Sequence, residues 1–172
     1  MMKSDREAPM TEVLIALGSN LGDRRALLSQ AIDRLAAILD ITSQSRLYQT
    51  APMYVSDQPA FLNMAVRGVT ALDPIALLDQ LKAIEEALGR AVSFRNGPRA
   101  IDLDILAFGD RVLDSERLTI PHPRLAERAF VLVPLMDIAA QWADPISGDT
   151  VTALLAAVSG RETVVPADPP QL

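Results

Sequence analysis

The chain has 172 residues, of which 49% are hydrophobic and 22% charged, and its formal net charge at pH 7 is −6. This composition is typical of a globular protein with a substantial core, and it excludes wholesale disorder. The negative charge argues against nucleic acid as the main partner, and the lack of cysteine excludes disulfides and thiolate metal sites.

No apolar stretch approaches the roughly 20 residues of a membrane span, so we expect no membrane contact and a cytoplasmic monomer. The length favours one domain over residues 1–172, with a core at about residues 11–159. Loose termini are expected at residues 1–10 and 160–172, because the second of these carries three prolines.

In the first half of the chain, apolar alternation predicts strands over residues 12–17, 42–48 and 61–70. A turn at residues 18–23 leads from the first strand into a helix, which Asp23 can cap and whose apolar residues recur to Leu39. The glycines of this turn lack the lysine and the spacing of a phosphate-binding loop, so the sequence favours a structural turn.

In the second half, Asp73-Pro74 is typical of a helix start and Gly89 of a helix end. A strand is expected over residues 101–108, with Gly109-Asp110 as a hairpin turn into residues 111–113. Two short helices should follow, at residues 129–140 and 151–158. The order strand, helix, strand, strand, helix, strand is that of a ferredoxin-like α+β sandwich. We therefore expect an antiparallel sheet with helices packed on it and a C-terminal helical addition.

Two aspartates interrupt the strand expected at residues 101–108. The apolar side chains of this strand fall on one face and those of Asp102 and Asp104 on the other, because successive side chains alternate. One interpretation is a half-exposed strand with two solvated acids. Two like charges on one face repel, however, and oxygen ligands without His or Cys select Mg²⁺. Mg²⁺ commonly joins one or two carboxylates to substrate phosphates, and Arg99 would then hold a phosphate oxygen.

Seven of the 14 arginines lie between residues 90 and 128. This clustering fits either a solvated surface or a phosphate clamp, because a guanidinium binds phosphate oxygens in pairs. The only histidine, His122, lies between two prolines, which predicts an exposed, rigid turn. One histidine cannot make a metal site, so a hydrogen bond to a ligand is favoured over a purely structural role.

Six sequence blocks occur in order along most of the chain, from about Val13 to Ala139: ALGSNLGDR (16–24), LYQTAP (47–52), DQPAFLN (57–63), IEEALGR (84–90), GPRAIDLDIL (97–106) and LTIPHPRLAERAFVLVPL (118–135). Together they resemble the 6-hydroxymethyl-7,8-dihydropterin pyrophosphokinases of folate biosynthesis. The resemblance implies a ferredoxin-like fold. It also implies transfer of a pyrophosphoryl group from ATP to the pterin hydroxymethyl oxygen, with release of AMP.

The same resemblance implies roles for individual residues. Asp102 and Asp104 would hold two Mg²⁺ ions that bridge the ATP phosphates, with Arg90 and Arg99 completing the catalytic group. The residues implied to bind ATP are Glu85, Arg99, Ile105, Arg117, Thr119, His122 and Arg128. The residues implied to bind the pterin are Thr50, Pro52, Met53, Phe61, Asn63 and Phe130. Aromatic rings can stack on the faces of a flat heterocycle such as a pterin, and an asparagine amide can form hydrogen bonds with its edge. Without the resemblance, Phe61 and Phe130 would be interpreted as core residues.

Some positions depart from the family pattern. The segment between Arg90 and Gly97 reads AVSFRN, where relatives are usually richer in arginine, and Asn96 stands where an aromatic residue is common. These changes concern residues 91–96, a segment expected to close over the active site, and they leave the metal and pterin residues intact.

Two other functions stay open at this point. One is a different metal-dependent phosphoryl enzyme, such as a cyclase-like palm domain, which also carries carboxylates on a ferredoxin-like sheet. The other is a non-catalytic small-molecule-binding regulatory domain of the same fold. Only a pyrophosphokinase requires both ATP and a pterin, and a regulatory domain gives no reason for Asp102, Asp104 and Arg99 to lie together.

Overall fold

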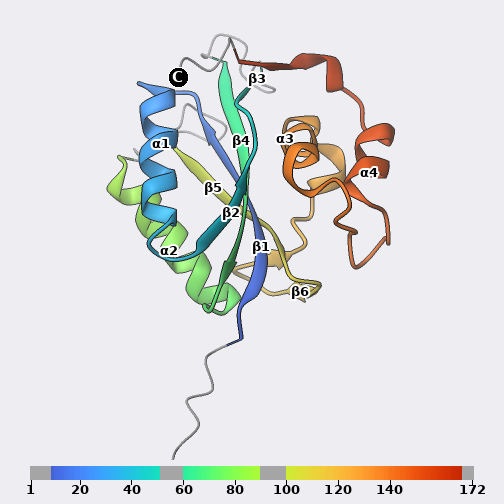
Figure 1. Cartoon of the computed structure of the whole chain (residues 1–172), viewed down its shortest axis with the longest axis horizontal. Coiled ribbons are helices and arrows are strands. Elements are labelled where there is room, and N and C mark those ends of the chain that lie inside the picture. The colour runs from blue at the N-terminus through green and yellow to red at the C-terminus, as the bar shows by residue number, and fades with distance from the viewer. Residues whose placement is uncertain (1–8, 51–59, 90–99, 168–172) are drawn as a thin grey trace, which may run out of the picture.

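The structure is a computed structural model that describes residues 9–50, 60–89 and 100–167. Its elements are β1 (Thr11–Ser19), α1 (Arg24–Leu35), β2 (Asp40–Gln44), β3 (Tyr48–Thr50), β4 (Phe61–Thr70), α2 (Pro74–Ala87), β5 (Asp102–Phe108), β6 (Leu113–Asp114), β7 (Thr119–Ile120), η1 (Leu125–Glu127), α3 (Ala129–Ala139), α4 (Val151–Ala157), η2 (Arg161–Thr163) and β8 (Val164–Pro166). The expected mixture of helices and antiparallel sheet is confirmed (Figure 1).

One antiparallel sheet organises the molecule. Its strand order is β5-β1-β4-β3-β8, and β2 also pairs with β4, beside β3. The central pair is β1 with β4, in a register that runs from Thr11 opposite Thr70 to Ser19 opposite Leu62. Within the described residues, β5 therefore forms one edge of the sheet, with β1 as its only neighbour in it.

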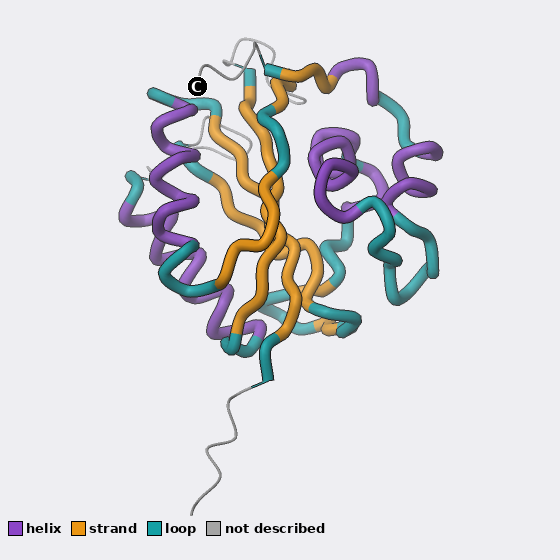
Figure 2. Tube along the Cα trace, viewed as in Figure 1, coloured by secondary structure: helices purple, strands orange, loops and turns teal. Residues whose placement is uncertain are grey.

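Helices cover both faces of this sheet, α1 and α2 on one side and α3 and α4 on the other (Figures 1 and 2). The larger core lies on the α1 side, where Leu28, Leu77 and Leu81 pack with strand residues such as Ile15 and Val66. A second core on the α3 side contains Leu14, Ala65, Leu106, Leu132 and Leu135. The three long strands β1, β4 and β5 thus send side chains into two different cores, which accounts for their largely apolar sequences.

Local chemistry sets the starts of α1 and α2 and the end of α2 as the sequence predicts, whereas α1 ends at Leu35 and does not extend to Leu39. The Asp23 side chain accepts a hydrogen bond of 3.1 Å from the Ala26 N–H at the start of α1. The Asp73 side chain does the same for α2, at 2.8 Å from the Ala76 N–H. Gly89 follows α2 with a φ of 85°, a conformation that favours glycine. In the described residues, no helix combines the length and the apolar character needed to cross a membrane.

The structure differs from the prediction around the first two strands. β1 continues to Ser19, so Gly18 lies within a strand and not in the turn expected at residues 18–23. The single strand expected over residues 42–48 is two short strands, β2 and β3. The side chain of Ser45 separates them, because its hydroxyl bonds to main-chain groups of both its own segment and β4.

The expected hairpin and the expected loose tail are also wrong in part. After the turn at Gly109, β6 pairs with β7 and not with β5. Residues 161–166 form η2 and β8, and β8 pairs with β3. The prolines do not prevent this pairing, because Pro166 is the last residue of a strand at the edge of the sheet. Val164 is buried there, so the core extends beyond the expected limit.

Candidate active site

The two strand aspartates lie on the α3 face of the sheet. Asp102 is opposite Gly18 of β1 and Asp104 is opposite Ala16. The intervening Leu103 is only 4% exposed and packs in the larger core on the other face, so the predicted alternation is confirmed. Asp102 is half-buried and Asp104 is exposed. Their Cα atoms are about 6.5–7 Å apart, a spacing from which both carboxylates can reach one site.

A β-bulge connects this strand to the histidine segment. The register between β1 and β5 shifts after Ile105, so that Leu106 has no direct partner on β1. The Leu106 carbonyl instead accepts a hydrogen bond of 3.0 Å from the main-chain N–H of His122. β-Bulges often redirect a strand next to a functional site. Here the bulge lets the main chain of His122 bond to Leu106, which is two residues after Asp104 on β5.

The environment of His122 is more enclosed than the expected exposed turn, because its side chain is half-buried. Burial lowers the pKa of His122, the nearby carboxylate of Asp104 raises it, and the cations Arg128 and Arg124 lower it further. Its Nδ1 accepts a hydrogen bond of 3.1 Å from the Arg124 N–H. The neutral ring therefore carries its proton on Nε2, where it can donate to a ligand.

Glu85 reaches β5 from α2. The side chain is buried, at 4% exposure, and its Oε2 accepts a hydrogen bond of 3.0 Å from the Leu103 N–H. Because β5 lies at the edge of the sheet, an outward N–H on this strand needs an acceptor from outside the sheet. Glu85 supplies that acceptor at the residue between the two aspartates.

The predicted pterin residues continue the same face toward β3. Asn63 lies opposite Gly18 on one side and opposite Tyr48 on the other. The Asn63 side chain is buried, and its Nδ2 donates a hydrogen bond of 3.1 Å to Thr50 Oγ1. Phe61 precedes Asn63 by two residues on β4, so both point to the α3 face. The structure thus aligns Asp102, Gly18 and Asn63 in one cross-strand row.

Two further predicted residues lie at the start of α3. The guanidinium carbon of Arg128 is 5.5 Å from the ring centroid of Phe130, within range of a cation–π contact. Both residues are half-buried, and Phe130 packs against the second core and against Tyr48 and Val164. The α3 face therefore presents a cation and an aromatic ring near the row of strand residues.

Other predicted residues lie elsewhere. Arg117 is exposed and forms an ion pair with Asp79 of α2, and Thr119 is half-buried in β7. Ile105 is 3% exposed and packs in the larger core, on the face opposite the aspartates. Four predicted residues and the segment 91–96 fall outside the described residues; the four are Pro52, Met53, Arg90 and Arg99.

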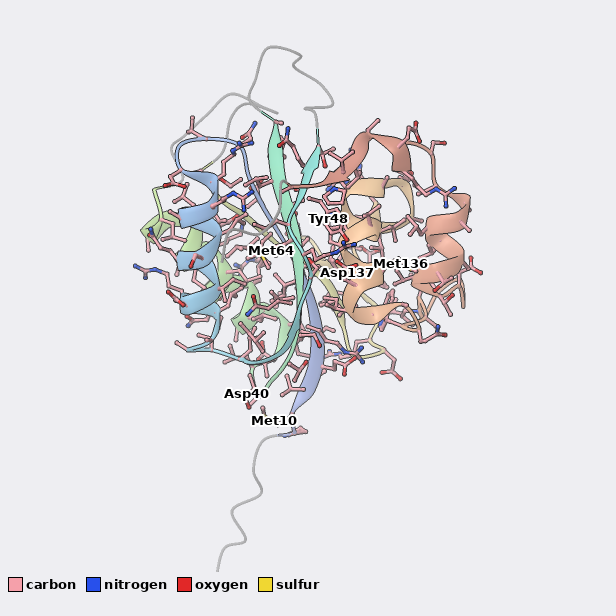
Figure 3. All side chains as sticks on the ribbon, turned by 45° about the horizontal axis from the view of Figure 1, so that its top comes forward. Met10, Asp40, Tyr48, Met64, Met136 and Asp137 are labelled. Carbon is pink, nitrogen blue, oxygen red and sulfur yellow. The ribbon has the colours of Figure 1, made fainter. Side chains whose placement is uncertain are left out.

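Sequence reasoning missed a polar network between β3 and α3, where Tyr48 and Asp137 meet (Figure 3). The buried Tyr48 hydroxyl donates a hydrogen bond of 2.7 Å to Asp137 Oδ2 and accepts one of 2.9 Å from Arg46. Burial raises the pKa of Tyr48, and its hydrogen bond to Asp137 raises it further. The partners are 89 residues apart in the sequence, and no local pattern joins them.

The donor set at the aspartates fits Mg²⁺. Within the described ranges, no group of three or more His, Cys, Asp or Glu side chains could hold a metal on its own. Asp102 and Asp104 offer two carboxylates on one partly exposed face of β5. A magnesium ion that also binds substrate phosphates needs no more than this from the protein.

Known proteins resemble this chain over most of its length. Residues 14–140 match the family described as 7,8-dihydro-6-hydroxymethylpterin-pyrophosphokinase. A 2-amino-4-hydroxy-6-hydroxymethyldihydropteridine pyrophosphokinase of Methylorubrum extorquens is 45% identical over 159 residues, which cover 90% of this chain and 99% of that protein. The protein of the same name in Bacillus subtilis is 48% identical over 129 residues, 74% of this chain and 77% of that protein.

Other relatives are much longer than this chain. It is 52% identical over 128 residues to the mitochondrial folate synthesis bifunctional protein of Arabidopsis thaliana, covering 74% of this chain but only 23% of that protein. Among solved structures, Plasmodium falciparum HPPK-DHPS superimposes with a TM-score of 0.70 at 17% identity, over 88% of this chain and 46% of that chain. The structural likeness supports the fold, and the sequence matches establish the relationship. The chain belongs to the 7,8-dihydro-6-hydroxymethylpterin-pyrophosphokinase family.

Proposed function

We propose that this chain transfers the pyrophosphoryl group of ATP to the hydroxymethyl oxygen of 6-hydroxymethyl-7,8-dihydropterin and releases AMP, as a step of folate synthesis. The observation that carries the proposal is the cross-strand row of Asp102, Gly18 and Asn63, in which a candidate metal ligand and a candidate pterin ligand share one face. The bacterial relatives named as pyrophosphokinases support the same activity.

Asp102 and Asp104 would hold the magnesium, with two ions as the family resemblance implies. Bound Mg²⁺ neutralises charge on the phosphates and orients them for in-line displacement. The two carboxylates suit this role because they are fixed by a strand and not by a loop. Glu85, which accepts a hydrogen bond from the Leu103 N–H, holds the main chain between the two aspartates.

His122 and Arg128 are proposed to bind the phosphates of ATP. The tautomer set by the Arg124 N–H leaves the Nε2–H of His122 as a donor, and a guanidinium adds a charge-assisted donor. A neutral imidazole retains this donor role, so the lowered pKa of His122 is compatible with it. The other residues proposed for ATP and the transferring phosphates are Glu85, Arg90, Arg99, Ile105, Arg117 and Thr119.

The pterin is proposed to bind over β1 and β4. Nδ2 of Asn63 is directed to Thr50, while its Oδ1 faces the space above Gly18, where it can accept from donors at the pterin edge. Phe61 and Phe130 offer aromatic faces to the ring. The other residues proposed for this subsite are Thr50, Pro52 and Met53.

The chain's own part in the reaction is positioning. The hydroxymethyl oxygen forms a bond to the β-phosphorus, and the bond from the β-phosphorus to the oxygen shared with the α-phosphate breaks. That oxygen leaves with its electron pair as part of AMP, and the hydroxyl proton passes to solvent. Little covalent chemistry falls to the protein, so holding the two substrates in line supplies most of the catalysis.

The strand order also supports the ferredoxin-like sandwich that the sequence predicts. With β2 and β3 counted as one interrupted strand, the order is β5-β1-β4-β2/β3, with α1 and α2 on one face. We propose that this is a ferredoxin-like sandwich, to which α3 and α4 are a C-terminal addition on the other face.

Nucleotide analysis of the reaction tests the function. Incubation with ATP, Mg²⁺ and 6-hydroxymethyl-7,8-dihydropterin should yield AMP and a pyrophosphorylated pterin in equal amounts. Omitting either the pterin or Mg²⁺ should abolish AMP formation. ADP as the pterin-dependent product would contradict the proposal, and binding of both ligands without turnover would favour a regulatory domain.

A further inference from the structure

Gly18 lies at the centre of the candidate site. In the sheet register it is opposite Asp102 on one side and opposite Asn63 on the other. Directly opposed residues of antiparallel strands send their side chains to the same face, so the three positions form a row perpendicular to the strands. Two strand spacings separate the main chains of Asp102 and Asn63, which is about 9.5 Å, with Gly18 midway.

The backbone at this position does not require glycine. Other glycines have positive φ angles, such as Gly22 at 72° and Gly109 at 57°, whereas Gly18 is not among them. Gly18 pairs regularly on both sides within β1, a conformation that any residue can adopt. Glycine inside a strand is also less favourable than alanine, because it loses more conformational freedom. A side chain at position 18 is therefore limited by space and not by backbone conformation.

The space in question lies against two predicted pterin residues. A Cβ atom built on Gly18 would be 3.0 Å from Asn63 Oδ1 and 3.8 Å from Phe61 Cδ1. The first distance is too short for an ordinary contact, so the Asn63 amide would have to move, although it is buried and bonded to Thr50. A side chain at position 18 would thus enter the region between Asn63 and Asp102.

Gly68 of β4 provides an informative contrast. A Cβ atom there would be 2.6 Å from Leu39 Cδ1 and 2.7 Å from the Asp40 carbonyl oxygen. Those neighbours belong to the connection after α1 and to β2, away from every predicted ligand residue. Gly68 is therefore explained by packing, whereas the neighbours of Gly18 are side chains proposed to bind substrate.

We propose that Gly18 is a specificity-determining residue, whose missing side chain lets the pterin ring, held between Phe61 and Phe130, bring its edge against the main chain of β1. The ring edge then meets Asn63 Oδ1, and the hydroxymethyl group extends toward Asp102. Glycine in a strand often marks a point where a ligand approaches the backbone closely. This inference rests on the proposed function, since it assigns the floor of the same site.

The test compares Gly18→Ala with the matched control Gly68→Ala. Calorimetric titration with 6-hydroxymethyl-7,8-dihydropterin, in the presence of Mg²⁺ and a non-hydrolysable ATP analogue, should show at least tenfold weaker binding for Gly18→Ala. Its affinity for the ATP analogue alone should stay within twofold of the parent, and its Tm should fall by less than that of Gly68→Ala. Pterin affinity unchanged in Gly18→Ala would overturn the proposal. Equal loss of pterin affinity in folded Gly68→Ala would also overturn it.

A second comparison covers the case in which Gly18→Ala folds poorly. The Asn63→Ala substitution removes the amide that a Cβ atom at position 18 would contact. The double variant Gly18→Ala/Asn63→Ala should therefore fold. It should still bind pterin at least threefold more weakly than Asn63→Ala alone, because the methyl group occupies the ring's space. Equal affinity would show that residue 18 acts only by displacing Asn63. If the parent protein forms no AMP and binds no pterin, the proposed function itself fails. An active parent with an unaffected Gly18→Ala rejects only the inference about Gly18.

Discussion

The buried carboxylate of Glu85 accepts a hydrogen bond of 3.0 Å from the main-chain N–H of Leu103. Leu103 lies between Asp102 and Asp104 on an edge strand, so its outward N–H has no partner within the sheet. This single contact ties α2 to the peptide that orients both aspartates. It gives Glu85 a positioning effect on the metal site, whether or not its side chain also contacts ATP.

Glu85→Ala should destabilise the fold more than Glu85→Gln, by about 1–3 kcal/mol, because alanine leaves the Leu103 N–H without its acceptor whereas glutamine retains one. Urea denaturation monitored by circular dichroism measures this difference. The turnover number should also fall more in the alanine variant. If the two variants unfold at the same urea concentration, the hydrogen bond does not stabilise β5.

Asp102→Asn and Asp104→Asn should each reduce turnover by at least about 100-fold, because losing a metal ligand removes charge stabilisation from the transition state. Asp110→Asn serves as the matched control, since Asp110 is exposed and follows the end of β5. AMP formation over a range of Mg²⁺ concentrations measures the effect. A variant of either strand aspartate that keeps activity within a few-fold of the control would remove that residue from the metal site.

Local patterns predicted those features that depend on neighbouring residues. The caps at Asp23 and Asp73, and the two faces of β5, follow from side chains a few positions apart, and the structure confirms them. The prediction of a turn at Gly18 is wrong, although Gly-Ser-Asn is typical of a turn. Only the pairing of Gly18 with both Asp102 and Asn63 reveals that the strand continues through it.

Features set by distant partners could not be predicted. The bulge at Leu106 matters because its carbonyl meets the His122 N–H, and that contact depends on how the chain returns to β5. Likewise, β8 forms because β3 presents an open edge, which the C-terminal sequence alone does not indicate. The candidate site combines both kinds of information: β5 supplies a local pattern, and the fold brings Asn63 beside it.

Tyr48→Phe tests the network between β3 and α3. The Tyr48 side chain is 3% exposed, so losing its hydrogen bond to Asp137 should cost about 0.5–2 kcal/mol of stability. Burial raises the pKa of Tyr48 above its ordinary value of 10.0. The folded state therefore retains the phenolic proton when the unfolded state has lost it, and the stabilisation declines as pH rises above that value.

Urea titrations between pH 8 and pH 11 should thus show stability falling with pH in the parent, and falling less steeply in Tyr48→Phe. A variant that changes the only other tyrosine, Tyr54→Phe, provides the control for general alkaline effects. Parallel pH profiles for the parent and Tyr48→Phe would show that Tyr48 does not contribute to this decline.

The pterin subsite gives the last prediction. Asn63→Ala should weaken binding of 6-hydroxymethyl-7,8-dihydropterin by about 1–3 kcal/mol, because a buried polar edge of the ring loses its partner. Thr50→Val should cause a smaller loss, since it removes one hydroxyl of the subsite, which accepts a hydrogen bond of 3.1 Å from Asn63 Nδ2, and leaves the Asn63 amide in place. Gln44→Ala, an exposed change on β2, is the control. Calorimetry that ranks Thr50→Val as more damaging than Asn63→Ala would mean that the threonine, and not the asparagine, contacts the ring.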